Sequence, residues 1–102
     1  MLELRPSCEN CETPLPPESK KAKICSFECT FCSDCVDNIL HNVCPNCGGG
    51  FVNRPIRPVK NWKNNNNLSN FPASRKETHC CVSESVHAVF SKEIRKIPPE
   101  DR

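Results

Sequence analysis

The stretch CSFECTFCSDC, residues 25–35, places four cysteines within eleven positions. Two C-x2-C pairs flank it, Cys8/Cys11 before it and Cys44/Cys47 after it. The full spacing is C-x2-C-x13-C-x3-C-x2-C-x2-C-x8-C-P-N-C. A C-x2-C pair can bind one tetrahedral metal ion through both sulfurs, at about 2.3 Å each. Eight paired thiolates match the ligand count of two closed four-sulfur sites, so we predict two zinc ions as the cofactors.

Size and composition agree with a fold that metal holds together. The chain has 102 residues, of which 36% are hydrophobic and 6% aromatic, and it contains ten prolines. A chain of this kind cannot bury a large core, and small domains then rely on metals or disulfides. We therefore predict a small, metal-stapled α+β fold, followed by a linker and a C-terminal helix.

Ten cysteines leave two explanations, a disulfide framework outside the cell or metal sites inside it. The first seven residues, MLELRPS, contain no apolar stretch of signal-peptide length, and nothing downstream resembles a membrane span. The expectation is a cytoplasmic protein with reduced, metal-bound thiols and no membrane contact. Iron is the minor alternative metal, because rubredoxin-like sites also use C-x2-C-G; zinc is favoured because no redox partner is indicated.

The local signals within the array predict its elements. Residues 22–31 alternate apolar and polar side chains and suggest a short β-hairpin that carries Cys25 and Cys29. A short helix capped by Ser33 or Asp34 should run to about residue 42, with one apolar face. Gly48 follows the last pair and tolerates a positive φ that turns backbone N–H groups toward sulfur. Residues 51–52 are a candidate last strand. The apolar helix face comprises Val36, Ile39, Leu40 and Val43.

The chain divides into four segments. Residues 1–57 contain the cysteine array, and residues 58–81 form a basic, asparagine-rich linker that we expect to be disordered. Residues 82–97 predict an amphipathic helix that Ser83 caps, and residues 98–102 form a tail. An isolated helix of this length is marginal in water, so its apolar stripe needs a partner: the zinc domain, a second copy or another protein. The stripe comprises Val82, Val86, Val89, Phe90, Ile94 and Ile97.

Two ways of sharing the ligands are open. In the sequential one, the first four cysteines bind one zinc and the last four bind the other. In the interleaved one, site one is Cys8, Cys11, Cys32 and Cys35, and site two is Cys25, Cys29, Cys44 and Cys47. The two-residue gap between Cys29 and Cys32 favours the interleaved form. The spacing then resembles the cross-braced RING-finger family, a treble-clef type of fold, and matches all eight of its ligand positions, with Cys29 where that family usually has His.

The same resemblance does not extend to ubiquitin-ligase activity. RING ligases usually have an apolar residue before the second ligand, where this chain has Asn10. They often have a bulky apolar residue on the helix between ligands six and seven, where this chain has Asn38, His41 and Asn42, and a cation after the last ligand, where it has Gly48. Two filled four-thiolate sites also leave no open coordination position for catalysis. We therefore expect no enzyme activity and no small-molecule substrate, and ligase activity is the least favoured alternative.

Several whole segments resemble a family of short bacterial cysteine-rich proteins that is catalogued as a domain of unknown function. The segments are LELRPSCENC, ICSFECTFC, CPNCGG and RPIRP, and the resemblance covers about residues 1–58. It implies a bacterial, cytoplasmic, zinc-binding protein and supplies no activity.

Two interpretations of the function remain, and one group of residues outside the cysteine array has no assigned role. The preferred interpretation is a zinc-stapled protein-interaction module. The alternative is a nucleic-acid-binding zinc ribbon, because residues 48–102 carry ten Lys/Arg against five Asp/Glu. Its candidate contacts are Arg54, Arg57, Lys60, Trp62 and Lys63. His79, Cys80 and Cys81 could form a redox or third metal site, but adjacent cysteines suit neither easily, so free thiols are expected. Glu9, Glu12 and Glu28 are expected to be solvated, and His41 and His87 to lie on the surface or in a helix.

Overall fold

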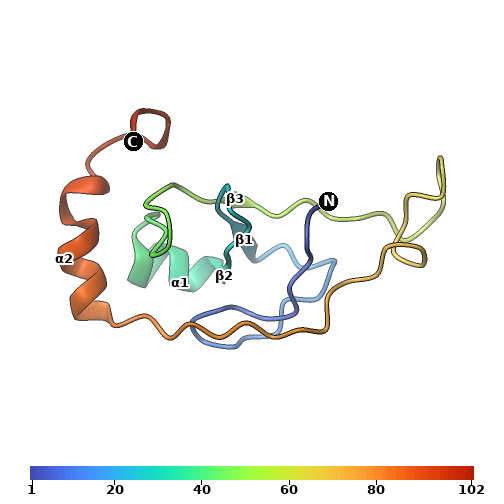
Figure 1. Cartoon of the computed structure of the whole chain (residues 1–102), viewed down its shortest axis with the longest axis horizontal. Coiled ribbons are helices and arrows are strands. Elements are labelled where there is room, and N and C mark those ends of the chain that lie inside the picture. The colour runs from blue at the N-terminus through green and yellow to red at the C-terminus, as the bar shows by residue number, and fades with distance from the viewer.

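The predicted hairpin organises the fold. A computed structural model describes residues 1–102 (Figure 1), in which β1 (Ala22–Ile24) pairs antiparallel with β2 (Thr30–Cys32). A short strand, β3 (Val52–Asn53), pairs antiparallel with the other edge of β1, giving the order β2-β1-β3. The hairpin and the last strand are therefore confirmed, and the molecule is a small α+β fold.

The helix follows β2 without a break. It begins as α1 (Ser33–Cys35) and continues as a π-helical turn, η1 (Val36–Leu40). His41 and Asn42 end it, because both adopt positive φ, at 52° and 58°. The predicted cap is wrong: Cys32 occupies the N-cap position and makes no side-chain cap bond. The strand runs directly into the helix, so neither Ser33 nor Asp34 lies before its first turn.

Cysteine contributes half of the small core. The cluster of twelve buried residues includes six cysteines, and Phe31 meets Phe51 edge-on at 5.6 Å between ring centres. Val36 and Leu40 are buried on the predicted face of the helix, while Ile39 packs at its margin. The apolar set is small, and half of the core consists of thiols that could hold a metal ion.

The chain after β3 makes a long excursion and returns. Residues 58–71 form a loop that projects from one end of the molecule (Figure 1, yellow). Arg57 closes the base of this loop, because its guanidinium donates to the carbonyl of Leu2 at 2.7 Å and to that of Phe71 at 2.7 Å. The returning chain leads to α2 (Glu84–Ile94) at the opposite end and then to η2 (Pro99–Asp101). The segment boundaries and the disorder expected for residues 58–81 stay predictions.

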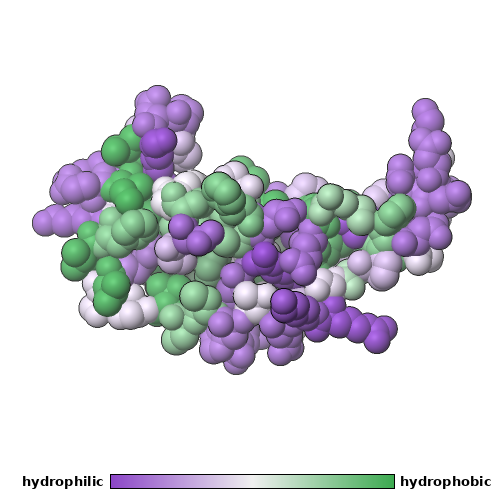
Figure 2. All heavy atoms as spheres, in the orientation of Figure 1, coloured by the Kyte–Doolittle hydropathy of each residue, from purple (hydrophilic) through white to green (hydrophobic).

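The C-terminal helix has the predicted cap and an unexpected orientation. Ser83 accepts a hydrogen bond from the backbone N–H of Val86, as predicted. The helix packs against η1, yet its buried residues are the polar His87 and Ser91. The apolar stripe is divided: Val82 packs against the core, and Phe90 and Ile94 lie near Gly48. Val86 and Val89 face outward, at 68% and 80% exposed. Figure 2 shows apolar surface over this end of the molecule. A hydrogen bond from His87 Nε2 to the carbonyl oxygen of Leu40, at 2.9 Å, fixes the inner face instead.

No helix in the structure has the length and apolar character needed to cross a membrane.

Arg54 provides a test of how the N-terminal segment is held. Its side chain is 3% exposed and donates to three backbone carbonyls, those of Arg5, Leu15 and Pro16. Arg54→Ala should lower the free energy of unfolding by about 2–4 kcal/mol, because it leaves three buried acceptors without a donor. Urea unfolding of the metal-loaded protein measures this change. The exposed Arg75 is the matched control, and Arg75→Ala should change stability by less than about 0.5 kcal/mol. Equal effects of the two substitutions would contradict the structural role of Arg54.

Candidate metal centre

The first sulfur cluster joins the beginning of the chain to the start of the helix. Its Sγ atoms all lie within 4.8 Å of one another, and they belong to Cys8, Cys11, Cys32 and Cys35. Cys8 and Cys11 lie on a tight turn that is closed by the hydrogen bond from Cys8 N–H to the Thr13 carbonyl, at 2.9 Å. Cys32 ends β2 and Cys35 ends α1, so one strand and one helical turn position the second pair.

This cluster has the dimensions of a tetrahedral thiolate site. Zinc–sulfur bonds of about 2.3 Å imply a separation of about 3.8 Å between neighbouring sulfurs. The Sγ atoms of Cys11 and Cys32 lie 3.7 Å apart. The donor set therefore fits one metal ion with four cysteine ligands and no open position.

The second cluster is less completely assembled. The Sγ atoms of Cys25, Cys44 and Cys47 lie within 4.8 Å of one another. Cys29 falls outside that group, although its thiol interacts with those of Cys25 and Cys44. Its Sγ also accepts a hydrogen bond from the side-chain amide of Asn46, at 3.5 Å. Cys29 is buried beside the cluster, so a small movement of its side chain would supply a fourth sulfur.

Backbone N–H groups are directed at the sulfurs of the second cluster. The N–H of Phe27 donates to Cys25 Sγ at 3.3 Å, that of Asn46 to Cys44 Sγ at 3.4 Å, and that of Gly49 to Cys47 Sγ at 3.4 Å. Gly48 has φ of 75°, which confirms the predicted role of that glycine in turning the chain. Donors of this kind stabilise negative charge on metal-bound thiolates.

The thiols differ in acidity. Burial acts to raise the pKa of Cys11, but hydrogen bonds from Thr13, together with Cys8 and Cys32, outweigh it and lower the pKa to about 7. Burial, followed by the neighbouring Cys25, raises the pKa of Cys29 to about 11. Burial also raises the pKa values of Cys35 and Cys44. The raised pKa values of Cys29, Cys35 and Cys44 favour the neutral thiol in the absence of a cation, and a bound metal ion would supply the charge that stabilises the thiolate.

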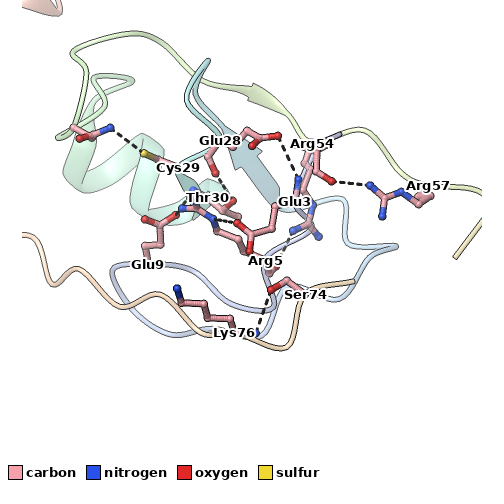
Figure 3. A network of polar contacts seen from close by, with 12 residues as sticks. Glu3, Arg5, Glu9, Glu28, Cys29, Thr30, Arg54, Arg57, Ser74 and Lys76 are labelled. Carbon is pink, nitrogen blue, oxygen red and sulfur yellow. Dashed lines mark hydrogen bonds and ion pairs between the residues drawn. The ribbon is translucent and has the colours of Figure 1, made fainter. Parts of the chain in front are cut away.

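Hydrogen bonds between Glu9 and Thr30, together with an ion pair from Glu9 to Arg5, link the first C-x2-C turn to the hairpin (Figure 3). Glu9 is 5% exposed, and its carboxylate accepts from Arg5 Nη1 at 2.7 Å and from the backbone N–H of Thr30. The backbone N–H of Glu9 also donates to the Thr30 carbonyl, at 3.0 Å. Thr30 follows Cys29 and Glu9 follows Cys8, so this contact ties the first pair to the hairpin. The expectation that Glu9 is solvated is wrong; the arginine four residues before it was the available signal.

The family model that matches residues 1–57 describes a protein of unknown function, DUF1272. The chain belongs to the DUF1272 family. An uncharacterized protein of Rhizobium meliloti (strain 1021) is 51% identical over 74 residues, which cover 72% of this chain and 81% of that relative. No solved structure matches the chain. The family segment contains the seven cysteines of the two clusters and also Cys29, and it ends at Arg57, just before the projecting loop.

The basic side chains of this DUF1272 protein do not form one surface. Arg54 is buried, and burial lowers its pKa. The guanidinium of Arg57 donates hydrogen bonds to two backbone carbonyls. Lys60, Trp62 and Lys63 remain exposed on the projecting loop, with Lys60 Nζ 5.9 Å from the centre of the Trp62 ring. The nucleic-acid interpretation stays a prediction and, in this geometry, rests on those three residues alone.

The remaining candidates from the sequence lie along the returning chain. Cys80 and Cys81 are exposed free thiols that belong to neither sulfur cluster. His79 lies beside the first C-x2-C turn, with Nδ1 3.3 Å from the Glu12 carboxylate and Nε2 3.1 Å from the Asn10 carbonyl. His41 is exposed, whereas His87 is buried on the inner face of α2.

Proposed function

We propose that residues 1–57 form a two-zinc, cross-braced module of the RING and treble-clef type, and that the chain acts as a cytoplasmic protein-interaction scaffold. The observation that carries this proposal is the grouping of the sulfurs. Cys8 and Cys11 lie with Cys32 and Cys35, while Cys25 lies with Cys44 and Cys47. The pairs therefore alternate along the chain, so the loop that each site closes contains a cysteine pair of the other site.

Zinc suits the donor set better than other metals. Thiolates are soft ligands, and a closed tetrahedral set of four is typical of structural zinc. The buried thiols with raised pKa values, Cys35 and Cys44, would lose their protons on binding. Cys29 is the proposed fourth ligand of the second site, because its thiol already contacts those of Cys25 and Cys44.

We propose a binding role rather than catalysis. Four thiolates around each ion leave no position for water or substrate. The surface where a RING ligase binds its partner enzyme is also covered by the chain itself. The Asn10 side chain accepts from Val82 N–H at 2.9 Å, α2 packs against η1, and Phe90 and Ile94 lie against Gly48. The exposed valines of α2 support contact with another protein.

Native mass spectrometry of the protein, purified from the cells that naturally produce it, tests the metal assignment. Two zinc ions per chain are expected, because one group of four sulfurs and one group of three, completed by Cys29, supply the donors for two sites. A single ion, or iron, would reject the assignment. Affinity capture then tests the interaction role: a partner should be retained by the zinc-loaded chain and lost after chelation. Retention that is insensitive to chelation, or retention of nucleic acid alone, would reject the scaffold role.

A further inference from the structure

Two thiols outside the sulfur clusters lie on a segment whose backbone is fixed. The N–H of Cys80 donates to the carbonyl of Glu9 at 2.6 Å, and the N–H of Val82 donates to Asn10 Oδ1 at 2.9 Å. Cys81 lies between these two anchors. Both side chains are exposed, so each sulfur is free to change rotamer while the backbone stays in place. Neither thiol is used by the proposed two-zinc module.

The two thiols line a cavity. Its volume is about 310 Å³, and it lies where this segment meets α2 and the third C-x2-C turn. Its apolar walls include Val82, Val86 and Phe90, and Pro45 from the third turn closes one side. A space of this size accommodates one small apolar group such as an aryl ring. Green surface in Figure 2 covers this end of the molecule.

The cavity also contains a nitrogen donor with a defined tautomer. His87 lines it and is 3% exposed. Its Nε2 lies 2.9 Å from the carbonyl oxygen of Leu40, which can only accept, so Nε2 carries the proton. The site therefore offers two soft sulfurs and an apolar space.

We propose that Cys80 and Cys81 form a site for a soft, thiophilic ligand with one small apolar substituent, with trivalent organoarsenicals as the ligand class. Arsenic(III) is pyramidal, and its bonds to two sulfurs meet at about a right angle, which adjacent cysteines can satisfy after rotation about χ1. Neighbouring cysteines cannot provide the linear S–metal–S geometry that a two-coordinate metal ion prefers. The aryl group of an arylarsenical would enter the cavity beside Phe90.

The binding step is a condensation without change of oxidation state. Phenylarsine oxide, C6H5AsO, reacts with the Cys80 and Cys81 thiols to form two As–S bonds and to break the As–O bond. Both thiol protons go to that oxygen, which leaves as one water molecule, and arsenic remains trivalent. No oxidant or reductant is required.

The test uses the full, zinc-loaded chain and phenylarsine oxide as the probe. Native mass spectrometry should show one adduct with loss of one water and with all bound zinc retained. Cys80→Ser and Cys81→Ser should each abolish the adduct, because a single thiol cannot chelate arsenic. Phe90→Ala should weaken phenylarsine oxide by about tenfold and leave methylarsonous acid nearly unchanged, because only the aryl group uses the cavity. Phe27→Ala is the matched control, since Phe27 is 67% exposed and lies outside the cavity.

Three outcomes would overturn the proposal. The first is an adduct that persists in Cys80→Ser and Cys81→Ser. The second is an adduct that forms only as zinc is released, which would place arsenic in the sulfur clusters. The third is equal weakening of both arsenicals by Phe90→Ala, which would show that the cavity does not select the substituent.

Discussion

Removal of the metal by a chelator should unfold residues 1–57. The expected result is loss of the folded domain, and not a folded domain with two empty sites. Six of the twelve residues in the core cluster are cysteines, and the sheet has only short strands. Binding of structural zinc contributes about 10 kcal/mol or more in small domains, which is comparable with the whole stability of a typical domain. Circular dichroism and limited proteolysis, recorded before and after chelator, measure the change, and added zinc should restore the signal.

The double variant Cys80→Ser/Cys81→Ser is the control for this experiment. These thiols lie outside both sulfur clusters, so the variant should unfold on chelation just as the parent chain does. Unchanged circular dichroism and unchanged protease resistance after complete metal removal would show that the apolar core is sufficient. The metal would then bind to a domain that is already stable, and would not be its main source of stability.

A pair of quadruple variants should separate the interleaved arrangement from the sequential one. In the first variant, serine replaces all four cysteines of the first cluster, Cys8, Cys11, Cys32 and Cys35. The interleaved arrangement predicts that this chain keeps one tightly bound zinc through the second cluster. In the second variant, serine replaces the first four cysteines of the array, Cys8, Cys11, Cys25 and Cys29. The interleaved arrangement then leaves two separate half-sites, and zinc affinity should fall by at least about a hundredfold.

The two variants remove the same number of thiols, so each is the control for the other. Competition with a chromophoric chelator measures the number of tight sites and their affinity. The sequential arrangement predicts the opposite order, because the second variant would retain one complete site. Tight binding by the second variant and not by the first would therefore reject the proposed ligand grouping.

Local sequence signals were sufficient for most elements near the cysteines. The alternation in residues 22–31 predicted the hairpin, and Gly48 predicted the left-handed turn after the last pair. Ser83 predicted the start of α2. Each of these features depends on residues within a few positions of one another, because turns, caps and strand alternation are set by local backbone geometry.

Long-range polar contacts were not accessible in the same way. Arg54 resembled a surface cation, but it is buried against carbonyls of Arg5, Leu15 and Pro16, which are about forty to fifty positions earlier in the chain. Glu9 resembled a solvated acid, but its carboxylate also accepts from the backbone N–H of Thr30, which lies 21 positions later in the chain. Composition gives the charge of a side chain and does not show which carbonyl or N–H the fold brings beside it.

By itself, the sequence determined that a small α+β domain contains eight paired cysteines and that an amphipathic helix follows it. Only the tertiary structure decided which pairs lie together, that Cys29 stands apart from the group of Cys25, Cys44 and Cys47, and that α2 turns its valines outward. The physical reason is that spacing limits how far apart two sulfurs can lie, whereas their meeting depends on the whole path of the chain between them. The buried face of α2 was decided by one hydrogen bond from His87 to Leu40 and by contact with Gly48. The spacing of apolar residues along the helix predicts neither contact.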